Sequence, residues 1–112
     1  MIDRKDIEDA VKQIIELFRP ERVILFGSYA YGTPHEDSDV DCMVILPFDG
    51  KPVRKAAEIA TAIKKRFPLD ILVQSPDRWE ARLHAQDPFI VEINEHGIEM
   101  YRRMVDGRGV SR

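Results

Sequence analysis

Apolar residues recur at helical spacing at the start of this chain and then gather in short runs, which predicts alternating helices and strands. The first helix carries an apolar stripe and ends before Pro20. Its apolar positions are Ile7, Val11, Ile14, Ile15 and Phe18. Asp3 and Asp6 lie at its start, where acidic side chains favour the positive end of the helix dipole. Residues 22–26 form an apolar run that ends at a glycine, so we expect a buried strand there.

A second strand is expected over residues 39–46, where side chains alternate between two faces. One face carries Val40, Cys42, Val44 and Leu46. The other face carries Asp39, Asp41, Met43 and Ile45. The polar residues of this strand are therefore confined to one end of one face.

The pattern then returns to helical spacing and ends in a third strand. Apolar positions from Ala56 to Phe67 trace the face of a second long helix, which Pro68 ends. Residues 69–73 form a strand that is apolar apart from Asp70. A carboxylate in such a strand is costly unless something binds it.

Two short helices and a last strand complete the expected elements. Ser75-Pro76 and Asp87-Pro88 each resemble a helix N-cap followed by proline at the first helical position. Gly97 is a suitable stop for the second helix, and residues 98–101 alternate as a strand. These two helices carry more apolar side chains than a thin domain is expected to bury, which predicts a partner surface. The side chains are Trp79, Leu83, Phe89, Ile90 and Ile93.

Together these elements predict an α/β (α+β) fold in one domain, residues 1–105, followed by a flexible tail, residues 106–112. We expect a small mixed sheet with the acids near the strand ends on one face and the helices packed on the opposite face. A chain of 112 residues with 44% hydrophobic content can bury one core.

Composition narrows the class of partner and the compartment. A net charge of −3 argues against a non-specific nucleic-acid surface. The single Cys42 cannot form an internal disulfide, and no apolar run approaches the roughly 18 residues of a membrane span. The chain opens without a signal-peptide pattern. We therefore expect a cytoplasmic protein with no membrane partner.

The acids predict a metal site. Residues two apart on a strand project from the same face about 6.6 Å apart, so Asp39 and Asp41 can converge on one or two divalent ions. Asp70 completes the set if its strand lies beside theirs, because paired strands are about 4.8 Å apart. Crowded carboxylates repel one another, and Mg²⁺ relieves this repulsion while bridging to substrate phosphates. Taken alone, each acid could also be an ordinary turn or strand-start residue.

The Gly27-Ser28 turn supplies a phosphate site. Glycine permits close backbone approach, a following helical turn offers free N–H groups to an anion, and Ser28 adds a hydroxyl. Read more simply, Gly27 only ends a strand and Ser28 only caps a helix. Because the turn lacks the Gly-Lys-Ser/Thr ending of a P-loop, we reject a Walker-type NTPase.

These residues stand in a specific order. Gly27-Ser28 is followed, after ten residues, by Asp39-Val40-Asp41, with Ala30 and Gly32 inside the loop and Ser38 just before the first acid. This pattern resembles the signature of the nucleotidyltransferases of the DNA polymerase β superfamily. The short order of elements resembles the minimal nucleotidyltransferases, including the MntA antitoxins that are paired with HEPN-domain toxins. The resemblance covers the chain from Val23 to about Tyr101.

The resemblance implies a polymerase β-like nucleotidyltransferase fold and a site. Its metal ligands fall on Asp39 and Asp41, its third carboxylate on Asp70, and its triphosphate-binding turn on Gly27 and Ser28. The implied reaction is Mg²⁺-dependent transfer of AMP from ATP, with two ions, to a tyrosine of a HEPN toxin. The implied biological role is that of an antitoxin, acting as a homodimer or in a hetero-oligomer with the toxin.

Two alternatives stay open. The chain could neutralise a toxin by binding alone, without catalysis. It could also modify an antibiotic or another small hydroxyl compound, as larger relatives do, although the additional substrate-binding domain of those relatives is missing here.

Overall fold

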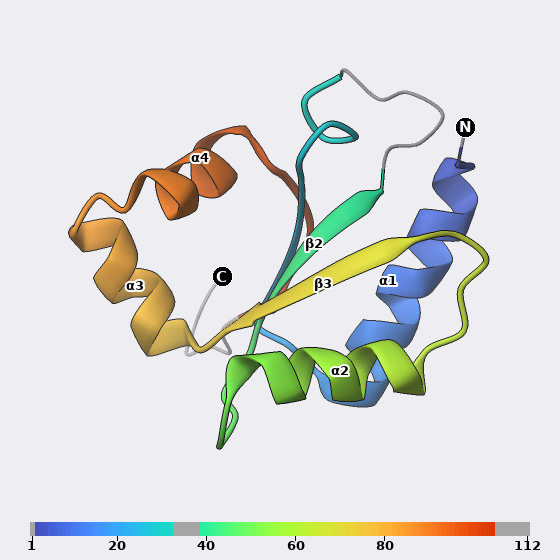
Figure 1. Cartoon of the computed structure of the whole chain (residues 1–112), viewed down its shortest axis with the longest axis horizontal. Coiled ribbons are helices and arrows are strands. Elements are labelled where there is room, and N and C mark those ends of the chain that lie inside the picture. Colours follow the sequence, from blue (N-terminus) through green and yellow to red (C-terminus); the bar gives the residue numbers. More distant parts are fainter. Residues whose placement is uncertain (1, 33–38, 105–112) are drawn as a thin grey trace.

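The structure is a computed structural model that describes residues 2–32 and 39–104. Ser38 of the sequence motif and the expected tail, residues 106–112, lie outside the described residues. Helices and strands alternate in the order that the hydrophobic pattern predicts (Figure 1). The elements are α1 (Arg4–Phe18), β1 (Arg22–Phe26), β2 (Val40–Ile45), α2 (Pro52–Ala62), β3 (Leu69–Gln74), α3 (Pro76–His84), α4 (Pro88–His96) and β4 (Ile98–Arg102).

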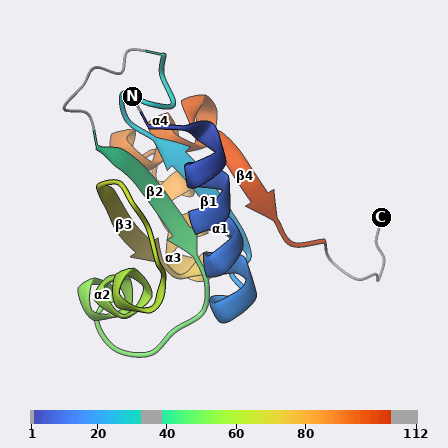
Figure 2. The same cartoon turned by 90° about the vertical axis from the view of Figure 1, so that its right-hand side faces the viewer.

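The four strands form one mixed sheet in the order β3-β2-β1-β4. β1 pairs antiparallel with both β2 and β4, whereas β2 and β3 run parallel. The parallel pair is possible because α2 carries the chain back between β2 and β3 (Figure 1). β1 and β2 therefore lie at the centre of the sheet, and β3 and β4 form its edges (Figure 2). The small mixed α+β fold is confirmed.

One face of the sheet is covered by α1 and α2. The apolar stripe of α1 packs against alternate residues of β2, and Ile59 of α2 joins the same core. Val40, Cys42 and Val44 all face this core, as the alternation predicts. Each of these three side chains is at most 1% exposed, so this face holds the main hydrophobic core.

The second face is also covered, and here the expectation of helices on one face was wrong. Trp79 of α3 and Ile90 and Ile93 of α4 pack on Met43 and Ile45, the side chains that alternate to the other side of β2. Figure 2 shows the strands between α1 in front and α3 and α4 behind. Both faces of the central strands are apolar, so both must be shielded from water. The proposed excess of apolar side chains on α3 and α4 is therefore largely core.

The start of α1 follows local chemistry, whereas the end of α2 does not. The Asp3 side chain accepts a hydrogen bond from Lys5 N at 2.9 Å and begins α1. The second helix ends at Ala62, earlier than predicted, and Ile63 is extended. Gln13 explains this end because its side-chain amide both donates to Lys64 O and accepts from Lys64 N, each at 2.7 Å. Ile63 and Phe67 reach the core from this extended segment instead of from a helix.

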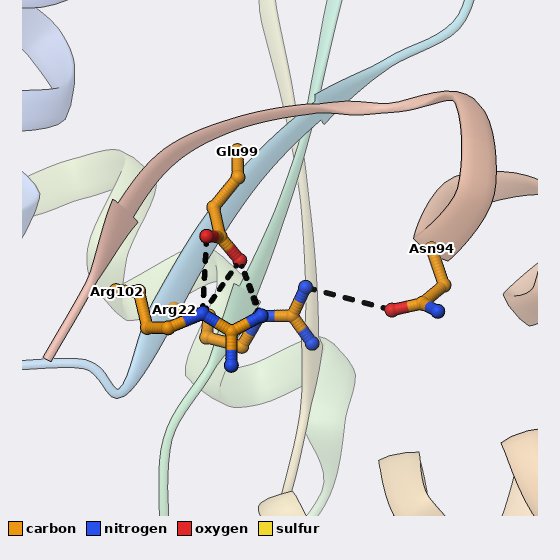
Figure 3. A network of polar contacts seen from close by, with 4 residues as sticks. All are labelled: Arg22, Asn94, Glu99 and Arg102. Atoms are coloured by element: carbon orange, nitrogen blue, oxygen red, sulfur yellow. Dashed lines mark hydrogen bonds and ion pairs between the residues drawn. The ribbon is translucent and has the colours of Figure 1, made fainter. Parts of the chain in front are cut away.

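A polar network attaches the edge strand β4 to its neighbours (Figure 3). Glu99 of β4 accepts hydrogen bonds from Arg22 Nε of β1 at 2.8 Å and from Arg102 Nε at 3.0 Å. Burial tends to raise the pKa of Glu99, but hydrogen bonds and charges from Arg102 and Arg22 together hold this pKa below its ordinary value. The Arg22 guanidinium also lies 5.6 Å from the centre of the Trp79 ring. Arg22 thus links the sheet to α3.

No helix among the described residues has the length and apolar content needed to cross a membrane.

Candidate active site

Two of the predicted acids lie side by side on neighbouring strands. The parallel register pairs Asp41 of β2 with Asp70 of β3, and Asp39 lies just before β2. Because paired residues of adjacent strands project to the same face, both carboxylates leave the sheet on the side that α3 and α4 cover. Partial burial raises the pKa of Asp41, and the charges of Asp70 and then Asp39 raise it further. The three acids therefore share one electrostatic environment.

Gly27 brings the turn that the sequence predicts as a phosphate site against these acids. It follows β1, whose last residue, Phe26, pairs with Asp41 across the sheet. A Cβ atom at Gly27 would overlap Asp41 Oδ2, and the φ angle of Gly27 is +80°. Both the close approach and the backbone angle thus require glycine. The predicted turn and the predicted acids meet at this contact.

Residues 27–31 form a single helical turn after β1. Ala30 N and Tyr31 N both donate to Gly27 O, at 3.1 and 3.0 Å. Ser28 is half-buried inside this turn. The expected short helical turn is therefore present, directly beside the acids, where backbone N–H groups and a hydroxyl can face an anion.

The two tyrosines of this turn have different surroundings. The Tyr29 hydroxyl accepts a hydrogen bond from Ile2 N at 2.6 Å and its ring packs on the first core. Burial raises the pKa of Tyr31, a hydrogen bond with the backbone of Gly27 lowers it, and the charges of Glu92 and Asp41 raise it. The charge of Asp41 therefore reaches the Tyr31 phenol. The sequence gave no sign of Glu92, because α4 reaches this turn only through the tertiary fold.

The acids form an open group and not a closed metal cage. Across residues 2–32 and 39–104, no three His, Cys, Asp or Glu side chains already converge as a metal-binding cluster. The donors near Asp41 are nevertheless all carboxylate oxygens that repel one another, which is the chemistry that a hard divalent cation relieves. Mg²⁺ typically takes one or two protein carboxylates and completes its shell with phosphate and water. The donor set fits such an open site.

Cys42, next to Asp41, takes no part in this chemistry. Its side chain is 1% exposed on the opposite face of β2, in the first core. Burial raises the pKa of Cys42 to about 12, and the charge of Asp41 adds to this effect. The thiol is therefore neutral and structural, as its position in the alternation indicates.

Comparison with known proteins gives this site a family. The family described as "Nucleotidyltransferase domain" matches residues 4–98, which is most of the chain. The chain belongs to this nucleotidyltransferase family. The protein is therefore an enzyme of the nucleotidyltransferase type, and the resemblance drawn from the Gly-Ser and Asp-Val-Asp pattern is confirmed.

Two relatives add to this assignment. This nucleotidyltransferase is 34% identical over 99 residues to a protein of Methanocaldococcus jannaschii named "Putative protein adenylyltransferase MJ0141", covering 87% of this chain and 90% of the relative. A crystal structure described as "a putative nucleotidyltransferase" from Sulfolobus solfataricus superposes with a TM-score of 0.60. That match has 19% identity and covers 88% of this chain and 79% of the other, which shows a shared fold.

Proposed function

We propose that this nucleotidyltransferase transfers AMP from ATP to a tyrosine hydroxyl of a partner protein, with Mg²⁺ as cofactor. The observation that carries the proposal is the pairing of Asp41 with Asp70 directly beside the Gly27 turn. The M. jannaschii relative, which carries the name of a protein adenylyltransferase, supports a protein acceptor. The match covers 90% of that relative, which also supports transfer by a domain of this size.

In this proposal each site residue has a role. Asp39, Asp41 and Asp70 hold the divalent cations, and Gly27 and Ser28 hold the triphosphate through the backbone and the hydroxyl. Bound Mg²⁺ ions would neutralise charge on the α-phosphate and on the leaving pyrophosphate.

The proposed transfer makes one bond and breaks one. The tyrosine oxygen bonds to the α-phosphorus, the bond from that phosphorus to the β-phosphate bridging oxygen breaks, and pyrophosphate leaves with the electron pair. Asp70 accepts the hydroxyl proton. Its place on the edge strand β3, outside Asp41, leaves its carboxylate open to an incoming acceptor.

We further propose that the partner is a HEPN-domain toxin and that this protein acts as its antitoxin. This role rests on the resemblance to the minimal nucleotidyltransferases. The antitoxin role is consistent with the family match, which spans 95 residues, positions 4 to 98.

The test is to incubate the protein with the HEPN protein of a neighbouring gene, labelled ATP and Mg²⁺, and to weigh the partner. We expect the partner to gain the mass of one or more AMP groups on tyrosine. A stable complex without added mass would favour neutralisation by binding alone. Label on a small hydroxyl compound but not on the partner would favour the small-molecule transferase.

A further inference from the structure

An open cleft of about 700 Å³ lies along the edge strand β3, between α2 and α3. Its floor continues from the acid site, because Asp70, Leu72 and Gln74 alternate onto the same face of β3. Leu72 and Phe89 both line the cleft and are 41% and 46% exposed. Apolar side chains this exposed next to an active site favour contact with a substrate or partner.

Gln74 lies at the far end of this floor with an unused acceptor. Its side chain is only 5% exposed, and among the described residues its Oε1 has no hydrogen-bond partner. A buried polar atom without a partner is costly, so such atoms are rare in folded proteins. Gln74 lines the cleft, but its Oε1 is shielded from solvent, so an occupant reaches this atom only if the side chain turns outward.

The charges around the cleft have one sign. Two arginines of α3, Arg78 and Arg82, line it, and no acidic residue does so among the described positions. Arg82 is already paired with Asp87 at 2.8 Å. Arg78 is exposed and has no ion pair within the described ranges. An occupant with a negative charge near Arg78 would complement this rim.

The direction of the reaction places the acceptor on this side of the sheet. In nucleotidyl transfer the attacking and leaving oxygens lie on opposite sides of the phosphorus. In the proposed site the pyrophosphate lies at Gly27, which follows β1, and β2 separates β1 from β3. The attacking hydroxyl therefore approaches over β3, where the cleft begins.

We propose that this cleft binds the polypeptide segment that presents the acceptor hydroxyl. The segment is extended, apolar where it covers Leu72 and Phe89, and acidic where it meets Arg78. An extended chain fits because β3 is an edge strand whose outer backbone groups can pair with an added strand. The inference rests on the proposed function and assigns its acceptor side.

The test uses two fluorescent tyrosine peptides that differ at one position. Both carry leucine beside the tyrosine, and one carries glutamate where the other carries lysine. Binding is measured by anisotropy, and AMP transfer to the same peptides is measured by mass. We expect the wild-type protein to prefer the glutamate peptide and Arg78→Glu to prefer the lysine peptide, a change in preference of about tenfold. Leu72→Ser should weaken binding of both peptides about equally.

Arg54→Glu is the matched control. Arg54 and Arg78 occupy the same position of α2 and α3, two residues after the proline that begins each helix, but Arg54 does not line the cleft. Arg78→Glu should also fold well, because glutamate three residues after the Ser75 N-cap completes a capping box. The control should leave the peptide preference unchanged.

The outcomes separate the two proposals. Reversed binding preference without AMP transfer would keep the cleft as a docking site and remove the proposed activity. AMP transfer with a peptide preference that Arg78→Glu does not alter and a peptide affinity that Leu72→Ser does not weaken would keep the activity and overturn the docking site. Competitive displacement of the peptide by ATP alone would show that the cleft holds the nucleotide. That result would also overturn the docking site.

Discussion

Asp41 and Asp70 face each other across the parallel pair of β2 and β3, so two carboxylates of neighbouring strands leave the sheet on the same face. Partial burial and the charge of Asp70 both raise the pKa of Asp41. Such a pair opposes folding in the absence of a cation and favours cation binding. The arrangement is expected of a site that is built for a ligand and not for stability.

Removing one member of this pair should stabilise the cation-free protein. We expect Asp70→Asn to raise the free energy of unfolding by about 1 kcal/mol or less, because a repulsive charge pair near water is worth about that much. Mg²⁺ should raise the melting temperature of the wild-type protein more than that of the variant. Thermal melts with and without Mg²⁺ measure both effects, with the exposed Asp49→Asn as control. A less stable Asp70→Asn protein would contradict the repulsion.

The raised pKa of Asp41 also sets a pH dependence. A carboxyl whose pKa is higher in the folded state stabilises the protein fully below its unfolded-state pKa, and this contribution is lost as pH rises through the folded-state pKa. We expect the Asp41→Asn variant to lack this pH-dependent loss of stability. Its free energy of unfolding relative to the wild-type protein should therefore increase as pH rises from about 3 to about 7, the range in which carboxyl groups ordinarily titrate. Urea melts across that range measure the difference. A difference that stays constant would show that Asp41 is unperturbed.

The contribution of Glu99 to stability should depend on pH with the opposite sign. Its pKa is lowered by Arg102 and Arg22, so its contribution is present above the unfolded-state pKa and is lost as pH falls through the folded-state pKa. We expect Glu99→Gln to cost about 1 kcal/mol at neutral pH, since the carboxylate is partly exposed and screened, and little in acid. Denaturant melts at both pH values test this. Glu58→Gln, in an exposed pair with Lys55, should cost less at either pH.

Two glycines with the same φ angle separate backbone strain from close contact. Gly27 and Gly32 both have φ of +80°, but an added Cβ meets Asp41 only at Gly27 and meets nothing within 4 Å at Gly32. We expect Gly32→Ala to cost about 1 kcal/mol from the backbone angle alone and Gly27→Ala clearly more. Gly27→Ala should also abolish nucleotidyl transfer. Equal costs in denaturant melts would mean that Asp41 moves aside freely.

The second face of the sheet can be tested through Trp79. This side chain of α3 is 1% exposed and packs on the sheet, so Trp79→Ala should lower the free energy of unfolding by about 3–5 kcal/mol. Leu17→Ala removes a side chain that is 58% exposed on α1 and should cost well under 1 kcal/mol. A similar small loss for Trp79→Ala would indicate that α3 does not pack on the sheet.

Local patterns predicted most elements and their caps because these depend on neighbours in sequence. The alternation along residues 40–46 gave both faces of β2 correctly, and Ser75 and Asp87 were recognisable caps. The end of α2 was not predictable because Gln13, 51 residues away from Lys64, decides it. The covering of the second face was missed because the apolar side chains of α3 and α4 fit either a partner surface or a core.

The candidate site shows the same division. The residue types and spacing of Gly27, Asp39 and Asp41 pointed to phosphate and metal chemistry before any geometry was known. The pairing of Asp41 with Asp70 needed the strand order, which depends on contacts across the whole chain. Tyr31 and Glu92 could not be selected from sequence, since only the fold brings α4 beside the Gly27 turn.

AMP transfer by the Asp39→Asn, Asp41→Asn double variant is the most direct measurement of the proposed site. The wild-type protein and the variant are incubated with labelled ATP, Mg²⁺ and the partner protein, and circular dichroism and a thermal melt confirm that both are folded. We expect the wild-type protein to label the partner and the folded variant to give no label above background. Undiminished label from the double variant would contradict the assignment of these carboxylates to catalysis.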